Sequence, residues 1–167
     1  MKRLLCLLAF TLLLVGCAGE KGIVDKDGYQ LDTRRQAQAA YPRIKVLVIH
    51  YTADDFDSSL ATLTDKNVSS HYLIPAVPPL YHGKPRIWQL VPEKDLAWHA
   101  GISFWRGATR INDTSIGIEL EGTDTLAYTD AQYQQLAAVT NALITRYPAI
   151  ANNMTGHCNI APERKTD

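Results

Sequence analysis

The stretch from Ile44 to Tyr51 constrains the fold of this chain more than any other part of the sequence. It is almost continuously apolar, rich in β-branched residues and preceded by Pro42. A strand with one solvent-exposed face alternates apolar and polar residues. A nearly continuous apolar run is therefore typical of a strand that is covered on both faces. We therefore expect a central strand over residues 44–51, with His50 at its end.

Two further segments predict strands beside this one. Residues 70–74 form a short apolar and aromatic run. Residues 86–91 lie between closely spaced prolines and favour an outer or antiparallel strand, joined to the preceding strand by a hairpin with an enlarged loop.

Residues 114–120 alternate between large apolar residues and others, which predicts a half-buried strand. Its second face carries Gly117 and Glu119, and Glu121 continues that polar side. Glu119 and Glu121 are equivalent by periodicity alone.

Two helices are predicted around these strands. A short one runs over residues 58–66 with Asp57 as N-cap. A longer one begins with the capping box of Thr129 and Gln132 and ends before Pro148. Strands mixed with helices in this order predict an α/β (mixed) domain, in which a central mixed β-sheet is flanked by helices.

The N-terminus has the features of a secretory signal peptide over residues 1–16. Lys2 and Arg3 precede an apolar run over residues 4–15. As a helix this run would be roughly 18 Å long, against a hydrocarbon core of roughly 30 Å, so it is short for a membrane span.

The residues Leu14-Val15-Gly16-Cys17 resemble the lipobox of bacterial lipoproteins. The resemblance implies cleavage before Cys17 and lipidation of that cysteine. The polar and weakly periodic residues that follow predict a tether over residues 17–40, ahead of a folded domain over residues 41–167. Ala18 in place of Asp resembles the pattern of lipoproteins sent to the outer membrane. We therefore expect a lipid-anchored protein at the outer membrane, on its periplasmic face, with the lipid bilayer as a partner.

Charge and cysteine content indicate which partners and which covalent cross-links are not expected. The chain has 17 basic and 17 acidic residues, and loss of residues 1–16 removes two basic ones, which leaves 15 against 17, a net charge of −2. Because there is no basic excess, we expect no nucleic-acid partner. Cys6 leaves with the leader and Cys17 is lipidated, so Cys158 has no intramolecular partner and no disulfide is expected.

Candidate metal ligands lie at two distant places in the sequence. His50 ends the central strand, whereas His157 and Asp167 lie in a short irregular segment at residues 156–167. Catalytic zinc commonly takes three ligands drawn from histidine and carboxylate and leaves a fourth position for water. The spacing alone is weakly specific.

Five ordered motifs carry a family resemblance: VIHYTA, SSHYLI, AWHAG, SIGIELEG and GHCNIAPERKTD. Together they resemble the zinc-dependent N-acetylmuramoyl-L-alanine amidase family related to peptidoglycan recognition proteins, over residues 43–167. The resemblance implies a type-2 amidase-like fold and a Zn²⁺ cofactor held by His50, His157 and Asp167.

The same resemblance implies the catalytic residues. It selects Glu119 rather than Glu121 as the acid/base, which would take a proton from water and deliver it to the departing amine. It places Lys165 as the group that stabilises the oxyanion.

Other histidines and cysteines receive different predictions. Trp98 and His99 precede a glycine turn and are expected to contact substrate, whereas His71, within a hydrophobic strand, is expected to be a hydrogen-bonded structural residue. His82 is expected on a surface loop. Cys158 is left out of the ligand set, because consecutive residues of an extended backbone point in opposite directions and burial as a small apolar residue suits it better.

The implied activity is cleavage of the amide between the lactyl group of muramic acid and L-alanine of the stem peptide, including anhydro-muramyl substrates. Peptidoglycan and muropeptides are then the partners, and a monomer is expected. The chain stops at Asp167 where relatives continue, so the domain is expected to be incomplete at its C-terminus, with a weakly fixed third ligand. A non-catalytic peptidoglycan-binding lipoprotein and a zinc endopeptidase acting on wall peptides are the alternatives.

Overall fold

The computed structural model describes residues 21–167, and the chain divides between Ala40 and Tyr41 into two compact units. The first contains an antiparallel hairpin of β1 (Ile23–Lys26) and β2 (Tyr29–Asp32), joined through a turn. The predicted tether therefore contains a short ordered hairpin. The predicted signal peptide and lipidated Cys17 lie outside the described residues.

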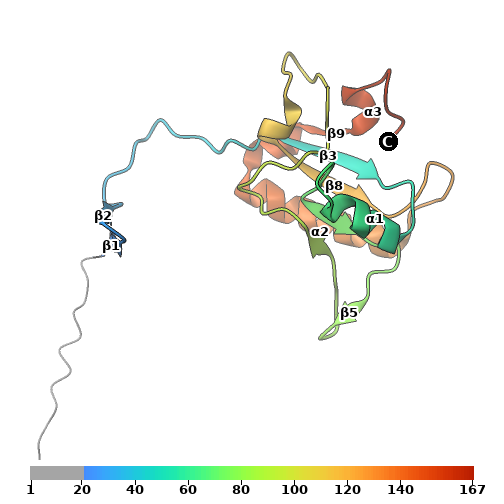
Figure 1. Ribbon diagram of the computed structural model, residues 1–167, viewed down its shortest axis with the longest axis horizontal. Coiled ribbons are helices and arrows are strands. Elements are labelled where there is room, and N and C mark those ends of the chain that lie inside the picture. Colours follow the sequence, from blue (N-terminus) through green and yellow to red (C-terminus); the bar gives the residue numbers. More distant parts are fainter. Residues whose placement is uncertain (1–20) are drawn as a thin grey trace, which may run out of the picture. The chain divides into compact units, whose positions relative to one another are not determined.

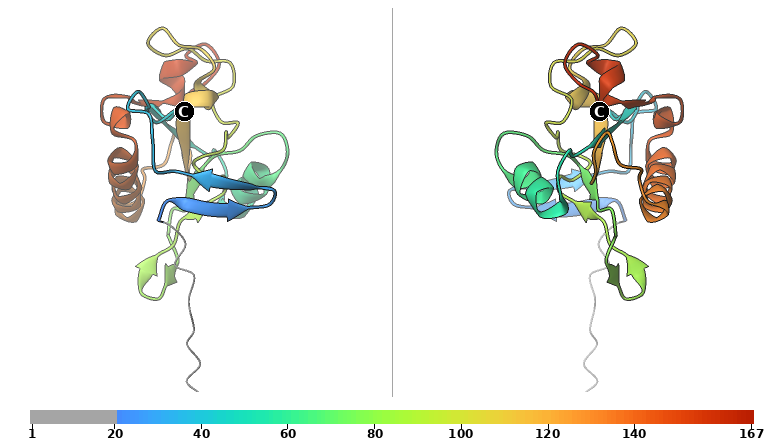
Figure 2. Two further views of the ribbon diagram at one scale, coloured as in Figure 1. Left: turned by 90° about the vertical axis from the view of Figure 1, so that its left-hand side faces the viewer. Right: turned by 90° about the vertical axis from the view of Figure 1, so that its right-hand side faces the viewer.

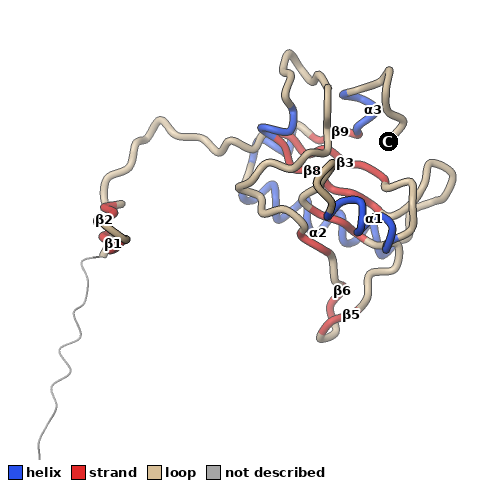
Figure 3. Tube along the Cα trace, in the orientation of Figure 1, coloured by secondary structure: helices blue, strands red, loops and turns tan. Residues whose placement is uncertain are grey.

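The second unit is built on a five-stranded sheet in the order β7-β4-β8-β3-β9. Strands β4, β8, β3 and β9 are parallel, and β7 pairs antiparallel with β4 at one edge. The neighbouring strands β8, β3 and β9 are labelled in Figures 1 and 3. The strands are β3 (Val46–Tyr51), β4 (Tyr72–Ile74), β7 (Trp88–Gln89), β8 (Ser115–Leu120) and β9 (Met154–Gly156). The mixed sheet confirms the predicted fold class.

Helices cover both faces of this sheet. Figure 2 shows α1 and α2 on opposite sides of it. The helical elements are α1 (Phe56–Thr64), α2 (Asp130–Arg146), α3 (His157–Ile160) and the 3-10 turns η1 (Ile111–Thr114) and η2 (Pro148–Asn152). A small hairpin of β5 (Leu80–Tyr81) and β6 (Lys84–Pro85) precedes β7.

Each face of the sheet has its own apolar cluster. On one face, Leu47 and Ile116 pack against α2, including its buried Leu143. On the other face, Val46 and Val48 pack with residues of the loops and turns that follow β7 and β9. The central strand is therefore covered on both sides, as its apolar sequence predicts.

Two local predictions were wrong. The N-cap of α1 is Asp55, whose Oδ1 accepts the N–H of Ser58 at 2.9 Å, so the helix begins earlier than predicted and Asp57 lies in its first turn. Strand β8 is not half-buried, because the His99 ring lies against its Gly117 face and that glycine is buried. When glycine alternates with large apolar residues, the glycine face of the strand is expected to be exposed to solvent. Here a side chain from another segment fills the space beside the glycine instead.

Within residues 21–167, no helix has the length and apolar character needed to cross a membrane.

Candidate metal centre and pocket

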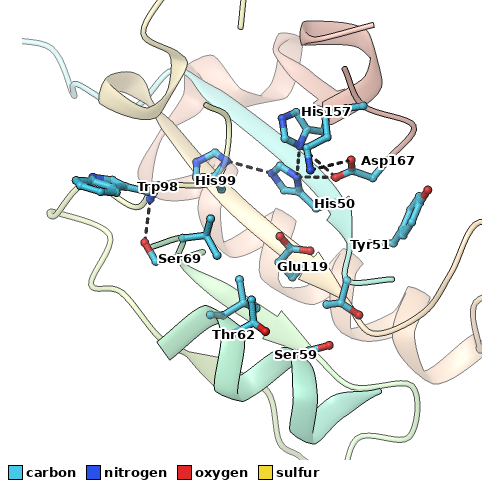
Figure 4. Close-up of a pocket in the computed structure, with 14 residues that line it drawn as sticks. His50, Tyr51, Ser59, Thr62, Ser69, Trp98, His99, Glu119, His157 and Asp167 are labelled. Atoms are coloured by element: carbon cyan, nitrogen blue, oxygen red, sulfur yellow. Dashed lines mark hydrogen bonds and ion pairs between the residues drawn. The ribbon is translucent and has the colours of Figure 1, made fainter. Parts of the chain in front are cut away.

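The sheet and the segment after β9 bring His50, His157 and Asp167 together. His50 lies near the end of β3, and His157 opens α3 directly after the neighbouring strand β9. His50 Nδ1 is 3.0 Å from both His157 Nδ1 and Asp167 Oδ2, and the last two atoms are 3.2 Å apart (Figure 4).

These distances suit a tetrahedral metal ion. Zinc binds nitrogen and carboxylate oxygen at roughly 2.0–2.1 Å, which places neighbouring ligand atoms about 3.3 Å apart. The ligand atoms of His50, His157 and Asp167 all lie within 4.8 Å of one another. Two imidazoles and one carboxylate match a catalytic zinc site, which leaves a fourth position open.

Burial and the close contacts among the ligands shift the pKa values of His50 and Asp167. Burial lowers the pKa of His50, with a smaller opposing effect from the neighbouring Asp167 carboxylate. Burial acts to raise the pKa of Asp167, but the neighbouring His157 and His50 rings outweigh it and hold that pKa well below its usual range. A neutral imidazole and an ionised carboxylate are the forms that bind metal.

Glu119 lies on β8 directly opposite His50 of β3 in the parallel register. Its Oε2 atom is buried and has no hydrogen-bond partner among the described residues. Burial, and next the negative charge of Asp167, raise the pKa of Glu119 to about 8, while Lys165 acts in the opposite direction. A carboxyl group poised near neutral pH is suited to proton transfer.

A pocket of about 200 Å³ opens beside these groups and is lined by His50, Glu119, His157, Lys165 and Asp167. In Figure 4, Ser59 and Thr62 of α1 form the wall opposite the metal ligands. Lys165 Nζ lies 3.9 Å from Asp167 Oδ1, so one carboxylate oxygen faces the lysine and the other the histidines. All five residues predicted as ligands, acid/base and stabiliser therefore line one pocket.

Trp98 and His99 both line this pocket but differ in exposure. Trp98 is 59% exposed, and its backbone N–H donates to Ser69 Oγ at 2.9 Å. His99 is buried, and both of its ring nitrogens have protein partners, His50 Nε2 at 3.1 Å and Ser115 Oγ at 3.1 Å. Its predicted contact with substrate stays a prediction, and these contacts favour a different role.

Burial, and next the nearby histidines, lower the pKa of His99 well below its ordinary value. His71 is also buried, and its Nδ1 accepts the N–H of Gly117 at 3.1 Å while its Nε2 donates to Asp95 O at 3.2 Å. These bonds agree with the structural role predicted for His71.

His82 lies exposed in the turn between β5 and β6. Cys158 is helical rather than extended and is partly exposed, so the physical reason given for leaving it out was wrong. Among the described residues it does not join the metal-ligand group. Glu121 lies beyond the end of β8, and its Oε2 accepts the N–H of Ala76 at 2.7 Å, away from the pocket.

Several residues that build the site were not predicted. Asn112 Oδ1 accepts the N–H groups of His99 and Ala100, at 3.2 and 2.8 Å. Arg164 Nη2 donates to Ala100 O at 2.9 Å. The sequence offered one signal for this arrangement, because a glycine inside a strand, here Gly117, often marks a close approach by another group.

Known proteins resemble this chain in sequence and in fold. The family model described as N-acetylmuramoyl-L-alanine amidase matches residues 40–167. The N-acetylmuramoyl-L-alanine amidase AmiD of Escherichia coli (strain K12) is 68% identical over 176 aligned residues, which cover 100% of this chain and 64% of AmiD. The chain thus spans less than two thirds of that relative's length.

Two solved structures share the fold. E. coli AmiD in complex with the substrate anhydro-N-acetylmuramic acid-L-Ala-D-gamma-Glu-L-Lys has a TM-score of 0.80 and 68% identity, covering 89% of this chain and 61% of that one. AmpDh3 of Pseudomonas aeruginosa in complex with anhydromuramic pentapeptide has a TM-score of 0.71 and 36% identity, covering 86% of this chain and 60% of that one.

Proposed function

We propose a function that proceeds from family membership: this chain belongs to the N-acetylmuramoyl-L-alanine amidase family. It hydrolyses the amide between the lactyl group of N-acetylmuramic acid and L-alanine of the peptidoglycan stem peptide, anhydro-muramyl peptides included. The observation that carries the proposal is the convergence of three ligand atoms within 3.0–3.2 Å beside the buried Glu119.

The cofactor is Zn²⁺, held by His50 Nδ1, His157 Nδ1 and Asp167 Oδ2. A zinc ion held by these residues would act as a Lewis acid, which would polarise the substrate carbonyl and make water easier to deprotonate near neutral pH. The donor set and its distances support zinc rather than magnesium or calcium, which prefer oxygen ligands alone.

Glu119 accepts a proton from the attacking water and delivers it to the departing amine nitrogen. Such positioned proton transfer typically contributes about 100- to 10,000-fold to the rate. The Lys165 ammonium group lines the same pocket and stabilises negative charge on the carbonyl oxygen of the substrate.

The partners are peptidoglycan and its muropeptide fragments, and the chain acts as a monomer. The two solved relatives carry anhydro-muramyl peptides, which supports such fragments as substrates. A non-catalytic binding role would need neither the buried Glu119 nor Lys165 beside the ligands, so the complete set favours catalysis.

The proposal is tested by incubating the zinc-loaded protein with anhydro-N-acetylmuramyl tripeptide and analysing products by mass spectrometry. The expected products are the free sugar acid and a peptide beginning with L-alanine. EDTA abolishes product formation and added zinc restores it, whereas Glu119→Gln binds zinc and forms about 100- to 10,000-fold less product. Cleavage within the peptide would identify an endopeptidase, and unchanged substrate would leave binding alone.

We propose in addition that acylated Cys17 anchors the protein in the outer membrane, facing the periplasm. The lipobox-like residues before Cys17 support the anchor, and Ala18 supports the outer-membrane destination. Mass spectrometry of the mature N-terminus should find a lipid-modified cysteine, and Cys17→Ala should move the protein out of the membrane fraction. An unmodified mature protein in the soluble fraction would contradict the anchor.

A further inference from the structure

We propose that Ser115 and His99 are positioning residues for the metal site: a chain of hydrogen bonds through them holds the His50 ring with its bare Nδ1 toward the metal. The inference rests on the zinc site of the proposed function. His99 touches the ligand His50, and Ser115 touches His99, but neither residue belongs to the ligand set. Metal-bound histidines commonly depend on such outer partners.

The donor and acceptor roles along this series of hydrogen bonds are set at Ser115, the end most distant from the metal ligands. Ser115 Oγ lies 2.7 Å from Ile111 O, and a carbonyl oxygen only accepts, so the hydroxyl group donates its proton there. The Ser115 oxygen is then left as an acceptor for His99 Nε2, 3.1 Å away. His99 therefore carries its proton on Nε2.

The next link follows from the first. A neutral His99 that is protonated at Nε2 has a bare Nδ1, and this atom lies 3.1 Å from His50 Nε2. His50 must therefore donate from Nε2, which leaves its own Nδ1 as a lone pair. That Nδ1 is the atom 3.0 Å from both His157 Nδ1 and Asp167 Oδ2.

The position of the His99 ring is fixed by strand β8 and by hydrogen bonds to the backbone around His99. A Cβ atom at Gly117 would lie 2.5 Å from His99 Cγ, so only glycine lets the ring rest on strand β8. The backbone before and after the ring is tied to Asn112.

The second histidine ligand is oriented by the same loop. His157 Nε2 donates to Ala100 O at 3.1 Å, which likewise leaves its Nδ1 as a lone pair. Arg164 Nη2 donates to the same carbonyl oxygen at 2.9 Å. Neighbouring residues of one loop thus fix the ring orientation of both histidines.

The main test compares Ser115→Ala with Ser70→Ala in the full chain. Both serines are buried, but Ser70 Oγ has no hydrogen-bond partner among residues 21–167, which makes it a matched control. Zinc affinity is measured by competition with a chromophoric chelator, and thermal unfolding of the metal-free proteins checks folding. We expect Ser115→Ala to bind zinc about 10- to 100-fold more weakly and Ser70→Ala to bind it like the wild type.

A second measurement does not depend on any variant. Long-range ¹H–¹⁵N spectra of the histidine-labelled wild type should show His99 protonated at Nε2 and bare at Nδ1, with and without zinc. With zinc bound, His50 should carry its proton on Nε2.

The outcomes separate the two proposals. If the wild type binds zinc and Ser115→Ala binds it equally well, or if His99 is protonated at Nδ1, the positioning role is wrong while the amidase proposal stands. An equal loss in Ser70→Ala would also overturn it, because any buried serine would then matter. If the wild type binds no zinc, both proposals fail.

Discussion

The carboxyl group of Glu119 is buried near a second acid, Asp167, and its pKa is raised to about 8. Between the ordinary value of 4.5 and this value, the folded metal-free protein retains a proton that the unfolded chain has lost. The stabilisation from the protonated form is therefore complete below pH 4.5 and is lost as the pH rises through about 8.

We expect the free energy of unfolding of the metal-free wild type to fall relative to Glu119→Gln over this pH range, by at most about 1.4 kcal/mol per pH unit. The glutamine is neutral at every pH and lacks this dependence. Urea unfolding of both proteins at a series of pH values measures the difference. Parallel pH profiles would show that Glu119 ionises normally in the fold.

At the scale of single residues, the residues predicted as ligands, acid/base and stabiliser meet in one pocket, but the contacts that orient the histidine rings were not predicted. Glu119 and Glu121 were equivalent by periodicity, and only the family motif separated them. The structure gives the physical difference, because Glu121 lies past the end of β8 and accepts a backbone N–H. The partners of His99 could not be predicted, because they depend on how the loop that carries His99 packs against Ser115 and Gly117 of strand β8.

At the scale of elements, the absence of a side chain at Gly117 of strand β8 leaves room for the His99 ring. We expect Gly117→Ala to lower the free energy of unfolding by about 1–3 kcal/mol, because the added methyl group overlaps the His99 ring. His99→Ala removes that ring, so the double variant should lose less stability than the sum of the single variants. Urea unfolding of all four proteins measures this coupling, and simple additivity would mean that the two positions do not touch.

Helix α2 begins with the predicted capping box. Thr129 Oγ1 accepts the N–H of Gln132 at 3.1 Å and donates to Ala76 O at 2.7 Å. Thr129→Ala should therefore lower the free energy of unfolding by about 1–2 kcal/mol. The exposed Thr145→Ala in the same helix should change it by less than about 0.5 kcal/mol. Equal effects of the two variants on urea unfolding would argue that the cap contributes nothing.

The two helix starts show what local sequence decides. The capping box of α2 was identified correctly because Thr129 and Gln132 act within four residues of each other. For α1, the sequence predicted Asp57 as N-cap, whereas the structure uses Asp55, because the choice depends on the backbone geometry of the preceding turn. Propensity alone does not contain that information.

At the scale of the whole molecule, the residues of both apolar clusters and of the metal-site pocket all lie within residues 41–167. We expect a fragment of residues 41–167 to unfold cooperatively at the same temperature as the longer chain and to bind zinc with the same dissociation constant. Calorimetry and chelator competition measure the two quantities. A lower unfolding temperature of the fragment would show that residues 21–40 stabilise the domain.

The sequence also predicted the fold class, because apolar runs and helical periodicity are local properties. It did not contain the strand order β7-β4-β8-β3-β9, since neighbours in a sheet are chosen by contacts between distant segments. The family resemblance implied that His50 meets His157, but the structural cause of that meeting, the pairing of β3 with β9, is seen only in the structure.

The parallel register of β3 and β8 gives the site a further property. It pairs His50 with Glu119, and a slip of one residue would turn these two side chains to opposite faces of the sheet. A misaligned sheet could still be compact and apolar inside, but it would contain no complete site. Recovery of zinc binding during refolding therefore reports the correct strand register, and it distinguishes correctly paired molecules from compact molecules with misaligned strands.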